Sequence, residues 1–111
     1  MQIHRLDPAE YYPLLDERQP PSLVILPAPA CGACRRLLVV IDEMAPIAGL
    51  DVLVVSAERA AGLIEELEIF HLPAIFLYRD GDLHAEIHAV LRPDALRAAI
   101  ESAQLAPPAV Q

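Results

Sequence analysis

The feature that most constrains this chain is the segment Cys31–Cys34, Cys-Gly-Ala-Cys, which contains both of its cysteines. It follows an apolar run, Leu23–Leu26, and precedes residues 35–45, whose apolar side chains recur at the spacing of a helix with one buried stripe. Two thiols at the first turn of a helix lie close enough to form a disulfide bond. The partial positive charge and unpaired N–H groups of a helix N-terminus favour a thiolate at the first cysteine. The segment is therefore suited to thiol–disulfide exchange.

Length and charge limit what else the chain can be. Its 111 residues, 55% of them hydrophobic, suffice for one domain with one ordinary core. The net charge of −8, from 16 acidic residues against 8 arginines, argues against nucleic acid or a membrane surface as a partner. No apolar stretch approaches the roughly 20 residues of a membrane span, and the N-terminus resembles no signal peptide. We expect a single cytoplasmic domain over residues 1–111, with residues 105–111 as a flexible tail.

The hydrophobic pattern predicts alternating strands and helices. The chain opens with a candidate strand at Gln2–Leu6. A helix is expected to begin at Asp7, with Glu10 reaching back to cap it, and to be distorted at Pro13. Further strands are predicted at residues 23–26, 51–55, 74–78 and 83–90, and further helices at residues 35–45, 57–67 and 93–103.

The C-terminal half of this pattern predicts a hairpin. Residues 79–82 have the composition of a hairpin turn. In the strand that follows, His84, Glu86 and His88 alternate with apolar residues, so both histidines are expected on a solvent-exposed face. The order of elements predicts a central mixed sheet with helices on both faces, in which the cysteines follow the carboxyl end of a central strand.

In these features the chain resembles the thioredoxin-like proteins. The order of elements is theirs, the CxxC pair stands at the head of a helix after the second strand, and Leu72-Pro73 precedes a hairpin as their cis-proline does. The resemblance extends from about Ile3 to Leu105. It implies an α/β fold, the thioredoxin-like three-layer sandwich with a central mixed β-sheet between helices.

The resemblance also implies a function, that of a protein-disulfide oxidoreductase. Cys31 would attack the disulfide of a protein substrate, and Cys34 would resolve the mixed disulfide, most simply in the reducing direction. Electrons would come from a reductase or a small thiol, and no dissociable cofactor is implied. The residues that would contact the substrate are Ala30, Gly32, Ala33, Leu72 and Pro73.

The sequence departs from the usual thioredoxin pattern while keeping the dithiol. Ala30 stands in place of tryptophan, and Ala33 in place of the proline between the cysteines. Ile25 occupies the position of the aspartate that assists the resolving cysteine, and Ala74 that of the threonine after the cis-proline. These departures indicate a specialised or slower member of the family, with a restricted partner.

Other interpretations of the same residues stay open. Arg35 and His71 are candidates to favour the thiolate form of Cys31, or are ordinary surface residues. Metal is not expected, because the cysteines and histidines lack the paired spacing of a structural zinc site, although a site shared between two chains is an alternative. The competing class is a non-enzymatic interaction or redox-sensor module. An enzyme must lose turnover in Cys31→Ser, whereas a binding module should keep its partner.

Overall fold

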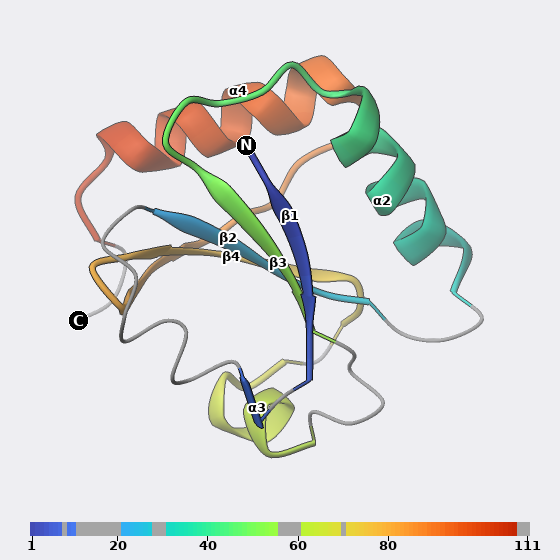
Figure 1. The fold of residues 1–111 in the computed structure, drawn as a ribbon, viewed down its shortest axis with the longest axis vertical. Helices are drawn as coiled ribbons and strands as arrows, with labels where there is room; N and C mark the ends of the chain where they lie inside the picture. Colours follow the sequence, from blue (N-terminus) through green and yellow to red (C-terminus); the bar gives the residue numbers. More distant parts are fainter. Residues whose placement is uncertain (8, 11–20, 28–30, 56–60, 70, 109–111) are drawn as a thin grey trace.

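The computed structural model of the protein describes residues 1–7, 9–10, 21–27, 31–55, 61–69 and 71–108. The strands are β1 (Ile3–Leu6), β2 (Ser22–Leu26), β3 (Asp51–Val55), β4 (Ala74–Arg79) and β5 (Asp82–Glu86), and the helices are α2 (Gly32–Glu43), α3 (Ala61–Glu66) and α4 (Pro93–Leu105). In this part of the chain a five-stranded sheet lies at the centre, with α2 and α4 over one face and α3 over the other (Figure 1). This confirms the three-layer α/β arrangement predicted from the sequence.

The strand order is β1-β3-β2-β4-β5. Strands β1 and β2 run parallel to β3, whereas β4 is antiparallel to β2 and β5 is antiparallel to β4. The predicted change from parallel to antiparallel pairing is therefore confirmed. In the β2–β4 pair, Leu26 lies opposite Ala74, so the end of β2 and the start of β4 occupy the same edge of the sheet.

The core is divided by the sheet into two clusters. Leu23 and Ile25 belong to the larger cluster, which α2 and α4 cover, whereas Val24 and Leu26 belong to the cluster on the α3 face. All five residues of β2 are buried, because helices cover both faces of this central strand. The apolar run in the sequence reflects this double coverage.

Several boundaries differ from those predicted. Helix α2 begins at Gly32 with Cys31 as its N-cap, which confirms that the cysteines stand at the first turn of the helix. It ends at Glu43, before the predicted Ala45, whereas α4 continues to Leu105, beyond the predicted Ala103. The capping of the first helix is confirmed, since the backbone N–H of Asp7 donates to Oε1 of Glu10 at 3.0 Å. The predicted distortion at Pro13, the start of the 57–67 helix and residues 109–111 of the predicted tail lie outside the described residues. None of the described helices is long and apolar enough to cross a membrane.

The β4–β5 hairpin contains a turn and a bulge. At the turn, Asp80 and Gly81 have φ values of 53° and 81°, the left-handed conformation that tight hairpins require. Further along, the register steps from Leu77 opposite Ala85 to Tyr78 opposite Leu83, which leaves one additional residue in β5.

That additional residue is His84, and the prediction that it is exposed was wrong. A bulge shifts the alternation of side chains by one, so His84 faces α4 and is only 5% exposed. Its Nε2 lies 2.9 Å from the carbonyl oxygens of both Ala103 and Ala106. Because a carbonyl only accepts hydrogen bonds, Nε2 carries the hydrogen and satisfies the end of α4. His88, which follows the end of β5, is exposed as predicted.

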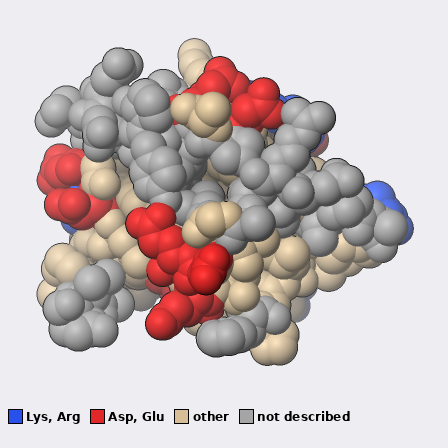
Figure 2. Space-filling model, turned by 90° about the horizontal axis from the view of Figure 1, so that it is seen from below, with Lys and Arg blue, Asp and Glu red and all other residues tan. Residues whose placement is uncertain are grey.

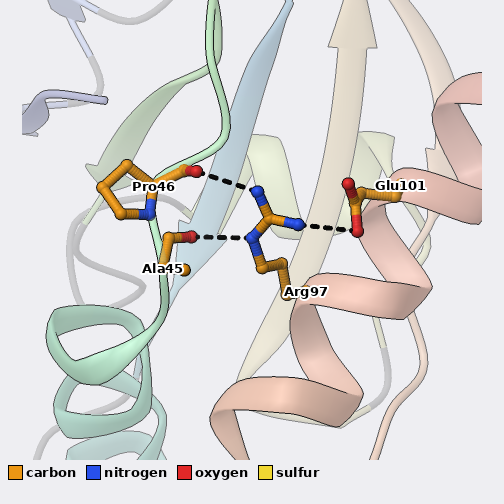
Figure 3. A network of polar contacts seen from close by, with 4 residues as sticks. All are labelled: Ala45, Pro46, Arg97 and Glu101. Atoms are coloured by element: carbon orange, nitrogen blue, oxygen red, sulfur yellow. Dashed lines mark hydrogen bonds and ion pairs between the residues drawn. The ribbon is translucent and has the colours of Figure 1, made fainter.

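A polar network joins α4 to the segment that follows α2 (Figure 3). The guanidinium of Arg97 donates from Nε to the carbonyl oxygen of Ala45 and from Nη2 to that of Pro46, both at 3.0 Å. Its Nη1 lies 2.8 Å from Oε1 of Glu101. One planar side chain therefore fixes the C-terminal end of the cysteine-bearing helix against its neighbour.

We expect Arg97→Lys to destabilise the fold by about 1–2 kcal/mol, because an ammonium group cannot reproduce this forked pattern and the site is partly exposed. Urea unfolding followed by circular dichroism measures the change. The matched control is Arg92→Lys, since the guanidinium of Arg92 lies 3.7 Å from Asp94 in a solvent-exposed contact. Equal losses in the two variants would contradict the role assigned to Arg97.

Candidate active site

The site is built around the N-terminus of α2. Cys31 is its N-cap residue, with an extended backbone (φ −111°, ψ 114°). The backbone N–H of Cys34 donates to Sγ of Cys31 at 3.1 Å, and the backbone N–H of Arg35 donates to the carbonyl oxygen of Cys31. A helix terminus thus directs an N–H group at this sulfur, an arrangement that stabilises a thiolate more than a thiol.

The two cysteines form a disulfide bond in this structure, and their Cα atoms are 5.2 Å apart. Their exposure differs: Cys34 is 2% exposed on the inner face of α2, whereas Cys31 is partly exposed at the end of the helix. A partner can therefore reach only the first sulfur directly. The second sulfur lies behind it, within bonding distance.

The proline loop lies at the same edge of the sheet as the cysteines. The Leu72-Pro73 peptide bond is cis, and Pro73 directly precedes β4. Because Leu26 at the end of β2 pairs with Ala74, this loop and the segment leading to Cys31 leave neighbouring strands at the same end. The side chain of Leu72 packs against the core cluster on the α3 face, which leaves Pro73 at the edge.

The other predicted substrate contacts are only partly placed. Gly32 and Ala33 are exposed in the first turn of α2, beside Cys31. Ala30 lies outside the described residues. At Ile25, the position of the family's aspartate, the side chain is fully buried in the apolar cluster beneath α2 and α4. The roles of Ala30, Gly32 and Ala33 in substrate binding stay predictions.

The two candidates for tuning Cys31 lie in different places. Nη2 of Arg35 lies 3.9 Å from the position that a Cβ atom on Gly32 would occupy, so its positive charge lies over the first turn of α2. His71 instead lines a cavity of about 300 Å³ beyond Pro73, together with Glu68 and other residues described below.

No sequence pattern predicts this cavity, because its lining comes from segments that are far apart in the chain. Glu68 follows α3 with a φ of 54°, a left-handed conformation that turns the chain sharply after the helix. After that turn, residues 68–69, 71 and 73 line the cavity together with Glu86 of β5, a juxtaposition that the sequence pattern does not show. Among the described residues, no group of three histidine, cysteine or acidic side chains is placed to hold a metal ion.

The fold and the site together define a protein with a thioredoxin fold and a CxxC pair at the active-site edge of its sheet. The thioredoxin family model matches residues 2–102, and the chain belongs to this family of thiol–disulfide oxidoreductases. Among solved structures, it is similar to mitochondrial thioredoxin 3 from Saccharomyces cerevisiae in its oxidised form. That match has a TM-score of 0.74 and 20% identity, covering 90% of this chain and 94% of the other. No curated protein sequence matches this one significantly.

In the reduced protein, we expect Cys31 to be alkylated about ten-fold faster than Cys34, because Cys34 is buried, whereas the sulfur of Cys31 is partly exposed and accepts an N–H hydrogen bond. Iodoacetamide labelling at pH 7, read by peptide mass spectrometry, measures both rates. In urea the rates should converge, which provides the control. Equal rates in the folded protein would contradict the assigned asymmetry.

We expect Arg35→Ala to lower the alkylation rate of Cys31 about two-fold at low ionic strength, the size of an exposed charge interaction, and to have no effect in 1 M salt. The matched control is Arg36→Ala, which removes the same charge from the next position. A larger effect in Arg36→Ala, or one that high salt leaves unchanged, would show that Arg35 does not act on Cys31 through its charge.

Proposed function

We propose that this protein reduces disulfide bonds in a partner protein through the Cys31–Cys34 dithiol, and that it does so in the cytoplasm. The observation that carries the proposal is the unequal exposure of the two sulfurs at the end of α2. A nucleophile must meet its substrate, whereas a resolving thiol must be close to the nucleophile but protected from other disulfides. Cys31 and Cys34 satisfy these two requirements in this order.

The reaction proceeds in two exchanges. The Cys31 thiolate attacks one sulfur of the partner's disulfide; a Cys31–partner bond forms, and the partner's other sulfur leaves as a thiolate and takes up a proton. Cys34 then loses its proton and attacks Sγ of Cys31. The Cys31–Cys34 bond forms and the second partner thiol leaves, so the partner gains two electrons and two protons. A reductase or a small thiol returns these to the oxidised protein.

The edge formed by Pro73 is suited to hold the partner during the first exchange. Pro73 and the first turn of α2 lie at the same end of neighbouring strands, so a segment bound against Pro73 is close to Cys31. An extended segment offers its backbone groups for hydrogen bonding, which positions a disulfide without demanding a particular sequence.

A redox sensor that binds its partner without turnover is the second candidate, and Ile25 is the observation that favours it. The resolving cysteine must lose its proton, and Ile25 provides no carboxylate to accept it where the family has one. A slow second exchange would prolong the mixed disulfide. The same residues would then report oxidation instead of catalysing reduction.

We expect the wild-type protein to reduce a protein disulfide repeatedly with dithiothreitol as electron donor, and Cys31→Ser to lose this activity because the attacking sulfur is absent. Cys34→Ser should accumulate a mixed disulfide at Cys31, visible by mass spectrometry. Turnover is followed by the release of substrate thiols.

The control is circular dichroism of both serine variants, because a native spectrum separates lost chemistry from lost structure. Wild-type turnover in Cys31→Ser would sink the proposal. Retention of a partner by Cys31→Ser, combined with a wild-type protein that completes only one reaction cycle, would favour the sensor.

A further inference from the structure

The cavity beyond Pro73 has a composition unlike the apolar layers of the core. Glu68 and His71 line one side, Glu86 and His88 line the other, and Phe76 contributes apolar surface. Its volume is about 300 Å³, enough for one large side chain. It is therefore an open pocket with carboxylate and imidazole groups around an apolar base.

The pocket lies within reach of a substrate bound at the active site. Pro73 borders it, and β4 separates β5, which carries Glu86, from β2, which leads to the cysteines. Strands lie about 4.8 Å apart, so the step from β2 to β5 is about 10 Å, or about three residues of an extended peptide. A peptide crossing Pro73 from Cys31 would bring a flanking side chain to the pocket.

The charge around the pocket favours a cation. Glu68 is exposed, and the side chain of Glu86 is 48% exposed. Oε2 of Glu86 lies 3.7 Å from Nε2 of His88, whose imidazole is charged only when it is protonated. Figure 2 shows the molecule from the α3 side, where acidic groups form several patches and basic groups lie at the margins. The whole chain carries a net charge of −8.

An arginine side chain matches these groups best. Its aliphatic stem can cover the apolar base at Phe76, while its planar guanidinium offers donors to two carboxylates at once. A carboxylate-bearing side chain would face repulsion from Glu68 and Glu86, and a small apolar one would leave the pocket unfilled.

We propose that this pocket is a subsite for an arginine side chain of the substrate protein, about three residues along the chain from the cysteine that Cys31 attacks. The proposal rests on the proposed function and adds its substrate class, disulfides flanked by basic residues. Glu68 and Glu86 are the residues that determine this specificity.

The test compares two disulfide-containing peptides that differ at one position, three residues from the cysteine that Cys31 attacks. One peptide has arginine at this position and the other has alanine. With the reduced wild-type protein at low ionic strength, we expect the arginine peptide to be reduced about five-fold faster, the effect of two exposed ion pairs. In the Glu68→Gln/Glu86→Gln variant this ratio should fall to about one. Glu43→Gln/Glu65→Gln, which removes the same two charges from exposed positions on α2 and α3 outside the pocket, should keep the ratio.

A second measurement separates this proposal from the function on which it rests. The same peptides with serine in place of cysteine cannot exchange disulfides, and their binding is followed by fluorescence anisotropy of a labelled peptide. Tighter binding of the arginine peptide, lost in the double variant, supports the subsite even if no peptide is reduced. Reduction without any preference, together with equal binding, overturns the subsite and leaves the function standing.

A side chain from a second copy of this chain could also occupy the pocket. Sedimentation velocity tests this alternative, because it distinguishes a monomer from a dimer. Dimers that the double variant loses, with no preference between the peptides, would overturn the proposal. A monomeric protein that prefers the arginine peptide would support it.

Discussion

The antiparallel pairing of β2 with β4 is the interaction on which the site depends. It places Leu26 opposite Ala74, so two segments that are 48 positions apart in the sequence end at one edge of the sheet. One segment leads to the cysteines and the other begins with the cis-proline. Without this register, the attacking sulfur and the surface that holds a substrate would belong to different regions of the molecule.

The hydrogen bond inside the motif acts at a shorter range. The N–H of Cys34 is one of the backbone donors that a helix N-terminus leaves without an intrahelical acceptor, and Sγ of Cys31 accepts its hydrogen bond. The same bond therefore caps α2 and favours the thiolate of the nucleophile. Stability of the helix and readiness of the site therefore depend on one geometry. Ile25, at the position of the family's aspartate, is buried in the apolar cluster beneath α2 and α4, so that position provides no charge to the site.

The sequence was sufficient to predict the layers and the place of the cysteines, because both follow from local patterns. A strand that is covered on both faces has a continuous apolar run in the sequence, and the residues of the first turn indicate where a helix begins. The position of His84 could not be predicted, since a single additional residue in β5 reverses which face a side chain takes. The pocket around Glu68 and Glu86 also escaped prediction, because it is made by distant segments that only the fold brings together.

The sheet also separates the protein into two halves with different tolerance for change. On one side, α2 and the 13-residue α4 enclose the larger cluster, and Arg97 connects them. On the other, α3, which is described over Ala61–Glu66, covers a second cluster beside the pocket. Among the described residues, the cluster on the α3 side contains fewer buried apolar side chains, so substitutions there touch fewer of these core contacts. Partner choice can diverge there during evolution while the redox chemistry, carried by the opposite half, is inherited intact.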